Sequence, residues 1–325
     1  MISNKITGVL PLKITGRHYV DNLSRCDLLF STVRHFGLAS LFAEIIIIVP
    51  NDERDIVCHH AAAWPDIPIR IVAEGGLLDV FQEYAKIYQV RPWHRQQIIK
   101  LFSATLVSTP FFLTLDPDVM AVRSFGYDDL IRDGRALIEP EPRTAHADWW
   151  RASASLLGLD PMLDKSGMSV TPALISSDIC RALMQRLTHQ YNKEWYRVLL
   201  ENYIIDWTEY TLYFLFAESN GMLHQLHRLP GENEPRLLAP YRVWRRADLD
   251  VQKLVGLFAV PQRDFFTVVQ SNSGVSASQI ARLIAPYVPV KMEKAETIAA
   301  KPGDKARELT GAAMRKIMGR LRRLH

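Results

Sequence analysis

Short apolar runs alternate with stretches of helical hydrophobic spacing along the first two thirds of the chain. Residues 44–49 (Glu-Ile-Ile-Ile-Ile-Val) form a continuous run that ends at Pro50, and residues 111–115 (Phe-Phe-Leu-Thr-Leu) form a second one. Continuous β-branched and apolar runs of this length are typical of strands buried on both faces of a parallel sheet. The pattern therefore predicts a parallel sheet that contains these two segments.

Helices are expected between these strands. Residues 93–107 place Ile98, Leu101, Phe102 and Leu106 on one side of a helix, which Thr109-Pro110 ends. Further strands are expected at residues 6–14, 69–72, 170–176 and 264–270, and further helices at residues 22–36, 178–189, 207–218 and 276–287. Strands that alternate with helices favour right-handed crossovers. We therefore expect the α/β fold class, with a mainly parallel sheet flanked by helices and a small C-terminal extension.

The chain divides into three sections by composition. Residues 1–235 carry the alternation of strands and helices and are expected to form the main domain. Residues 236–290 are expected to be a C-terminal extension that packs on this core. Residues 291–325 read as a linker and a basic, weakly amphipathic tail, in which residues 305–325 hold seven Lys or Arg and one Glu. This tail suits either a helix that lies on anionic lipid or a solvated, frayed end.

Charge and cysteine content narrow the class of protein. The formal net charge is only +4 and its basic excess lies in the tail, so no nucleic-acid partner is expected. The three cysteines are widely spaced and favour a reducing compartment. The N-terminus lacks the pattern of a signal peptide, and residues 44–49 are far shorter than the about 20 residues of a membrane span. We expect a cytoplasmic protein, with peripheral contact at the inner membrane face if the tail binds lipid.

Asp116-Pro117-Asp118 directly follows the second apolar strand. Ligands of open α/β sheets bind at the carboxyl ends of the strands, so the acidic pair has the position of a site residue. Pro117 fixes its own φ and helps to hold the turn. Two carboxylates this close repel each other unless a cation lies near, and Mg²⁺ or Mn²⁺ is often held by one or two carboxylates together with substrate phosphates. We therefore expect Asp116 and Asp118 to bind Mn²⁺ or Mg²⁺.

The segment FFLTLDPDVMAVR resembles the DXD segment of GT-A-fold glycosyltransferases of the bacterial polysaccharide and glycoconjugate type. The preceding WHRQQIIKLFSA resembles the helix before that segment, and GMSVTPALISSDICRALM and DWTEYTLYFLF resemble the later strand and helix on the acceptor side. The resemblance extends over roughly residues 6–228. It implies a GT-A-like domain that transfers a sugar from a nucleoside-diphosphate sugar to a hydroxyl of a glycan or glycolipid, with a divalent metal as cofactor.

The resemblance also implies which residues bind the donor. The loop after the first strand holds the nucleoside in these enzymes, which points to Thr15 and Arg17. Arg95 and Lys100, on the helix before the acidic pair, would face the diphosphate together with Asp116. Each of these basic residues also has an ordinary interpretation, because an exposed loop or a solvated helix face carries similar residues.

Two carboxylates and two histidines complete the candidate site. Asp206 and Glu209 lie in an apolar, aromatic segment that raises the pKa of a carboxylate, so either is a candidate base for the acceptor hydroxyl, and Trp207, Tyr210 and Tyr213 are candidates for a sugar-stacking wall. If configuration is retained, the carboxylates only orient the acceptor. The resemblance implies a late histidine as third metal ligand, for which the candidates are His224 and His227. Core packing or capping is the alternative for each.

Two other functions use the same residues. Phosphatases of the HAD type also place Asp-x-Asp after an apolar strand, with the first residue, here Asp116, as the nucleophile. Their acidic pair normally lies near the start of the domain and is followed by Thr or Val where this chain has Met120. An inactive binding protein with the GT-A fold is the second alternative, because fold alone does not determine function.

Overall fold

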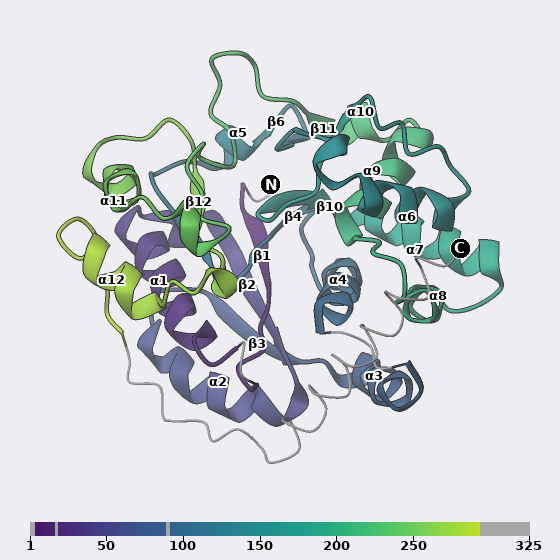
Figure 1. Cartoon of the computed structure of the whole chain (residues 1–325), viewed down its shortest axis with the longest axis horizontal. Coiled ribbons are helices and arrows are strands. Elements are labelled where there is room, and N and C mark those ends of the chain that lie inside the picture. Colours follow the sequence, from purple (N-terminus) through teal and green to yellow (C-terminus); the bar gives the residue numbers. More distant parts are fainter. Residues whose placement is uncertain (1–3, 17–18, 89–91, 293–325) are drawn as a thin grey trace.

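The computed structural model describes residues 4–16, 19–88 and 92–292 (Figure 1). Its central sheet has five strands in the order β10-β4-β1-β2-β3. Four of them are parallel: β1 (Ile6–Pro11), β2 (Phe42–Val49), β3 (Ile69–Ala73) and β4 (Phe111–Thr114). The edge strand β10 (Ala173–Ser176) runs antiparallel to β4. The predicted α/β fold class, a mainly parallel sheet flanked by helices, is confirmed.

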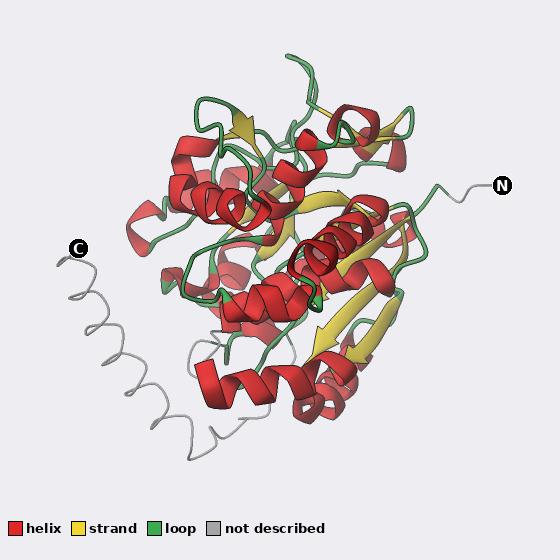
Figure 2. Cartoon of the chain, turned by 90° about the vertical axis from the view of Figure 1, so that its right-hand side faces the viewer, coloured by secondary structure: helices red, strands yellow, loops and turns green. Residues whose placement is uncertain are grey.

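Helices cover both faces of this sheet (Figure 2). On one face lie α1 (Asn22–His35) and α2 (Arg54–His60), which pack on Ile45 and Ile47 of β2. On the other face, Ile46 and Ile48 of β2 pack against a larger group of helices. This group consists of α3 (Gly75–Tyr88), α4 (Pro92–Phe102), α6 (Ala147–Leu157), α7 (Ser177–Tyr191), α8 (Trp195–Glu201) and α9 (Glu209–Ser219). Because consecutive residues of β2 enter opposite cores, the strand has no polar face, and this explains its continuous apolar sequence.

Smaller elements surround the main sheet. A three-stranded sheet joins β6 (Ile131–Arg132), β7 (Arg135–Leu137) and β11 (His227–Arg228), next to the short helices α5 (Tyr127–Leu130) and α10 (Leu223–Leu226). A two-stranded ladder pairs β8 (Glu141–Pro142) with β9 (Ser166–Gly167). In Figure 1, α5, β6, β11 and α10 lie near the upper edge of the molecule.

Residues 236–290 pack on the core through a third hydrophobic cluster. They supply α11 (Val251–Ala259), β12 (Phe266–Val268) and α12 (Ala277–Ile284). Leu28 of α1 and Met120 belong to the same cluster as Leu254 and Ile280 of these helices. Strand β12 pairs antiparallel with β5 (Val119–Ala121), which directly follows the acidic pair. The extension therefore reaches the neighbourhood of Asp118.

A buried arginine fastens this extension to α1. The guanidinium of Arg25 donates hydrogen bonds to the carbonyl of Val269, at 2.7 Å, and to that of Val275. Asp21 forms an ion pair with Arg25 at 3.3 Å and accepts a hydrogen bond from the backbone N–H of Ala277 at 2.7 Å. Because removal of such a buried donor leaves two carbonyls unsatisfied, these bonds hold residues 269–277 in one position.

None of the helices that the structure describes is long and apolar enough to cross a membrane. The expected linker and basic tail lie almost wholly in residues 293–325, outside the described residues. The expectation of lipid contact through that tail stays a prediction.

Candidate functional site

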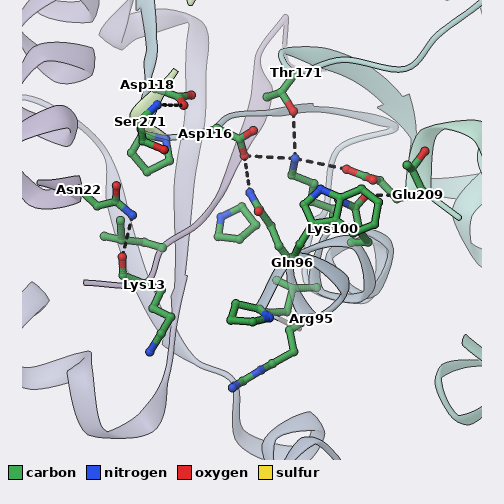
Figure 3. A pocket seen from close by; sticks show the side chains of 18 of the residues that line it. Lys13, Asn22, Arg95, Gln96, Lys100, Asp116, Asp118, Thr171, Glu209 and Ser271 are labelled. Carbon is green, nitrogen blue, oxygen red and sulfur yellow. Dashed lines mark hydrogen bonds and ion pairs between the residues drawn. The ribbon is translucent and has the colours of Figure 1, made fainter. Parts of the chain in front are cut away.

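A cavity of about 570 Å³ opens at the carboxyl ends of β1 and β4 (Figure 3). The loop after β4, helix α4, the first turns of α6 and α9, and the loop after β12 all contribute to its lining. Among the lining residues are Lys13, Asn22, Trp93, Arg95, Gln96, Lys100, Asp116, Asp118, Trp149, Thr171, Glu209, Gln270, Ser271 and Asn272. This is the position in which open α/β sheets bind their ligands.

Lys100 joins two carboxylates in this cavity. The side chain, on the last turn of α4, is only 2% exposed. Its Nζ lies 3.1 Å from Oδ1 of Asp116 and 3.2 Å from Oε1 of Glu209. It also donates to the hydroxyl of Thr171 at 2.9 Å (Figure 3). Burial alone would lower the pKa of Lys100, but the charge of Asp116, with that of Glu209, outweighs it and raises the pKa well above its usual value. Lys100 is therefore a permanent cation between the two acids.

Glu209 is a buried carboxylate with few partners. It is the first residue of α9, which begins where the hydroxyl of Thr208 accepts a hydrogen bond from the N–H of Thr211. Among the described residues, the one ion pair of its carboxylate is with Lys100, whose Nζ lies 3.2 Å from Oε1. Burial raises the pKa of Glu209, against the lowering effect of Lys100. A group in this state accepts protons readily.

Asp116 and Asp118 face the same cavity from the loop after β4. Oδ1 of Asp116 accepts a hydrogen bond from Nε2 of Gln96 at 2.6 Å and pairs with Lys100. Oδ2 of Asp118 accepts a hydrogen bond from the N–H of Ser271 at 2.9 Å. Burial raises the pKa of Asp118 to about 6, and the nearby charge of Asp116 adds to the rise, while the N–H of Ser271 opposes it. Burial and a neighbouring carboxylate thus both disfavour the charged form of Asp118, and a bound cation would favour it.

The donor set of this pair fits a hard divalent cation. Within residues 4–16, 19–88 and 92–292 no group of three or more His, Cys, Asp or Glu side chains is placed to hold a metal. Mg²⁺ and Mn²⁺ need fewer protein ligands than that when substrate phosphates and water complete the coordination. Two carboxylates on one turn, with Gln270, Ser271 and Asn272 also lining the cavity, provide only oxygen and amide donors.

Two cations, Lys13 and Arg95, lie together at another end of the cavity (Figure 3). Lys13, which follows β1, pairs with Glu53 at 3.3 Å. Arg95 forms an ion pair with Glu74, and its guanidinium lies 4.9 Å from the ring centroid of Phe81. The sequence reasoning did not select Lys13, although a basic side chain directly after the first strand is a usable signal for this position.

The structure describes Thr15 but not Arg17, the two residues expected to hold the nucleoside. Thr15 does not line the cavity. Its N–H donates to Oε1 of the buried Glu53 at 3.1 Å, its hydroxyl donates to the same oxygen, and the N–H of Ile14 donates to Oε2 of Glu53 at 2.7 Å. Thr15 thus shapes the loop after β1 while Lys13 lines the cavity. Arg17 lies outside the described residues.

The structure does not bring His224 or His227 to the acidic pair. The ring of His227 packs on Phe111, the first residue of β4, with 6.0 Å between centroids. Asp116 follows the other end of that strand, about 16 Å away at roughly 3.3 Å per residue. Both histidines line a second cavity. The expectation that one of them completes the metal site is therefore not met.

His227 instead belongs to a buried hydrogen-bond chain. The N–H of Ser176 donates to the hydroxyl of Tyr213 at 2.7 Å, and that hydroxyl lies 2.6 Å from Nε2 of His227. Nδ1 of His227 lies 3.2 Å from the carbonyl of Ala136. Burial lowers the pKa of His227 to about 4. The imidazole is therefore neutral, with its proton on Nδ1.

Two further expectations about the acceptor side need correction. Asp206 precedes α9 and does not line the cavity, so of the two candidate bases only Glu209 reaches it. Trp207 and Tyr213 are fully buried and Tyr210 is nearly so, with its hydroxyl 2.7 Å from that of Thr114. These three rings do not form a sugar-stacking wall, because packing in the core hides their faces.

The chain is thus an α/β protein with a cavity at the carboxyl ends of a mainly parallel sheet, and acidic and basic side chains converge in this cavity. The chain belongs to the family described as "Family of unknown function (DUF6492)", whose sequence profile matches residues 3–292. A comparison with curated protein sequences gave no match.

Three solved structures resemble the chain at low identity. The apo form of mouse xyloside xylosyltransferase 1 is 12% identical with a TM-score of 0.47, covering 83% of this chain and 99% of that one. Galactosyltransferase LgtC in complex with donor and acceptor sugar analogs is 9% identical with a TM-score of 0.43, covering 89% and 98%. Core-mannan synthase A from Aspergillus fumigatus in its Mn/GDP form is 11% identical with a TM-score of 0.40, covering 65% and 69%. At such TM-scores these likenesses carry no functional argument.

Proposed function

We propose that the protein is a metal-dependent glycosyltransferase that moves a sugar from a nucleoside-diphosphate donor to a hydroxyl of a glycan or glycolipid. One observation carries the proposal. The acidic pair Asp116 and Asp118 shares a single cavity with Glu209, a carboxylate that is only 1% exposed and pairs with Lys100. The pair supplies the donor half of such a reaction, and Glu209 supplies the acceptor half. The sequence resemblance around the acidic pair supports the same assignment.

On the donor side, Asp116 and Asp118 would hold Mn²⁺ or Mg²⁺ together with the diphosphate. When bound, such a cation neutralises the negative charge that develops on the departing nucleoside diphosphate. Lys13 and Arg95 line the same cavity and are placed to meet further phosphate or ribose oxygens. Gln96 fixes the Asp116 carboxylate through the hydrogen bond at 2.6 Å, so that the acid does not need to reorder when the donor binds.

On the acceptor side, Glu209 would receive the proton of the attacking hydroxyl if the reaction inverts the anomeric centre. Lys100 has two effects on this group. At 3.2 Å its charge opposes the rise that burial gives to the pKa of Glu209, and through Asp116 it connects the base electrostatically to the donor site. If the reaction retains configuration, Glu209 orients the acceptor instead. In both cases loss of its carboxylate impairs transfer more than donor binding.

Release of nucleoside diphosphate from a panel of nucleotide sugars, measured with Mn²⁺ and with EDTA, tests the proposal. We expect release that depends on the metal and that falls at least about a hundredfold in Asp118→Ala, because one of the two carboxylates at the cation is lost. Asp178→Asn is the matched control, since Asp178 pairs with Arg181 on the surface of α7. Turnover that persists in EDTA, or that survives Asp118→Ala, contradicts the proposal.

The same preparations separate the phosphatase alternative. A phosphatase that uses Asp116 as nucleophile hydrolyses p-nitrophenyl phosphate and loses this activity in Asp116→Asn. We expect no such hydrolysis, because the proposed reaction breaks the bond between the sugar and the diphosphate and forms no phospho-aspartate. A protein that binds nucleotide sugars but releases no diphosphate with any donor or acceptor would be an inactive binding protein.

A further inference from the structure

Two half-buried tryptophans line the cavity beside Glu209 and have no role in the reaction as described so far. Trp93 lies in the first turn of α4 and Trp149 in the first turn of α6. Their ring centroids are 5.9 Å apart, and the ring planes are tilted by 43°. Two indoles from different helices thus lie next to each other in the lining of the cavity.

Neighbouring rings hold this pair in place from both ends. The imidazole of His146 stacks on Trp149, with 3.9 Å between centroids and only 6° between planes. On the other side, Trp93 contacts His94 at 5.0 Å, and His94 contacts the buried Trp207 at 5.1 Å. The result is a row of five aromatic rings that runs from the cavity rim into the core. Rings that are already ordered lose little conformational freedom when a ligand binds.

The aromatic pair lies on the same side of the cavity as Glu209. Trp93 and Gln97 are four residues apart and therefore share one face of α4. Oε1 of Gln97 accepts the backbone N–H of Glu209 at 3.2 Å. From the other helix, the hydroxyl of Thr211 lies 3.4 Å from the backbone carbonyl of Trp149. Helix α4, through Gln97, and Trp149 are thus both bonded to the first turn of α9, which carries Glu209.

Hydroxyl groups lie beside the aromatic surface. Ser169, Thr171 and Thr208 line the same cavity. Ser169 donates a hydrogen bond to Glu141, whose carboxylate lies 3.7 Å from Nε2 of His146. The wall therefore combines an extended π face with short polar side chains at its edge. A pyranose has the matching chemistry, because its C–H face packs against an aromatic ring while its hydroxyls require hydrogen-bond partners.

We propose that Trp93 and Trp149 form the platform on which a pyranose ring of the acceptor glycan stacks, with its reacting hydroxyl directed toward Glu209. This inference rests on the proposed glycosyl transfer, and it assigns to these two indoles the binding of the acceptor sugar. Trp149 contributes the outer ring of the platform and Trp93 the inner one. The nucleotide belongs with Asp116, Asp118 and Lys13.

A binding experiment that needs no catalysis tests the platform. Wild-type protein is applied to a printed array of oligosaccharides, and the strongest array glycan is then titrated by tryptophan fluorescence. We expect Trp149→Ala to lower the affinity for this glycan about tenfold, and Trp149→Phe to stay within about threefold of wild type because it keeps an aromatic face. Tyr287→Ala, a change at an exposed aromatic residue of the C-terminal section, is the control. Affinity for UDP in the presence of Mn²⁺ should not change in any of these variants.

Three results would overturn the platform. The first is an unchanged glycan affinity in Trp149→Ala, and the second is a wild-type protein that retains no array glycan. The third is an equal loss of UDP and glycan binding in Trp149→Ala, which would assign the indole to the nucleobase. Failure of the glycosyl-transfer proposal is recognised separately: the wild type then binds glycan through Trp149 but releases no nucleoside diphosphate from any donor.

Discussion

Replacement of Lys100 by Met removes the central charge of the site and keeps a side chain of similar length. In the wild type, Nζ lies 3.1 Å from Asp116 and 3.2 Å from Glu209, in a position that is only 2% exposed. Removal of one partner from a buried ion pair destabilises a protein by about 3–5 kcal/mol, because the remaining charge is left uncompensated. We expect the lower end, about 3 kcal/mol, since Asp116 keeps its bond from Gln96 and Glu209 can take up a proton.

The pH dependence of the destabilisation in Lys100→Met follows from the direction in which the pKa of Glu209 is shifted. Burial already raises the pKa of Glu209, and without Lys100 its pKa rises further. An acid whose folded pKa exceeds its unfolded value reduces the stability of the fold as the pH rises through the folded pKa, and the loss is absent below the unfolded pKa. The deficit of Lys100→Met should therefore shrink as the pH is lowered toward the unfolded pKa of a glutamate, about 4. Wild type and variant should be compared by urea unfolding followed by circular dichroism.

The double variant Lys100→Met/Glu209→Gln provides the matched control. Glutamine keeps the shape of Glu209 without its charge, so the double variant should recover about 1–3 kcal/mol of the loss in the single one. The reasoning is refuted if Lys100→Met is as stable as wild type. It is refuted equally if the double variant recovers nothing and the deficit does not change with pH.

Two further predictions concern titration of single groups. Burial lowers the pKa of His227 to about 4, so on acidification this histidine takes up a proton in the unfolded chain before it does so in the folded one. Wild type should therefore lose about 2 kcal/mol of stability between about pH 7 and about pH 5. His227→Gln should lose less when both proteins are followed by urea unfolding. The pKa of Asp118 is raised to about 6, so protons compete with a bound cation below that pH. Calorimetric titration should show that the affinity for Mn²⁺ falls by up to about tenfold per pH unit below about pH 6. An affinity that does not change with pH would exclude Asp118 as a ligand.

Much of the main sheet could be predicted from the sequence because its signals are local. The apolar run at residues 44–49 is strand β2, and the run at residues 111–115 contains β4. Helix α6 was not predicted, although it lines the cavity through Trp149. Its sequence, ADWWRASASLL, mixes bulky and small residues. Its buried face is determined by packing against α9, which is distant in the sequence. Propensity and pattern weaken where tertiary packing decides.

The candidate site could also be predicted only in part. Five residues predicted from the sequence line the cavity, namely Arg95, Lys100, Asp116, Asp118 and Glu209. They could be predicted because they lie at the end of a strand or on helices whose patterns are local. Ser271 was not predicted. It reaches Asp118 because β12 pairs with β5, and the sequence of these short strands does not indicate that they pair. The expected position of His224 and His227 was wrong for the same reason. Their distance from the acidic pair is set by tertiary structure, and no local sequence pattern indicates it.

Crystals soaked with Mn²⁺ and UDP, and separately with Mn²⁺ and GDP, test the central claim most directly. We predict an anomalous difference peak for manganese in contact with carboxylate oxygens of both Asp116 and Asp118, adjacent to density for the diphosphate of one of the nucleotides. The same soak of Asp118→Ala crystals should lack the manganese peak. Nucleotide bound in the cavity without manganese, or manganese bound away from this pair, would contradict the account.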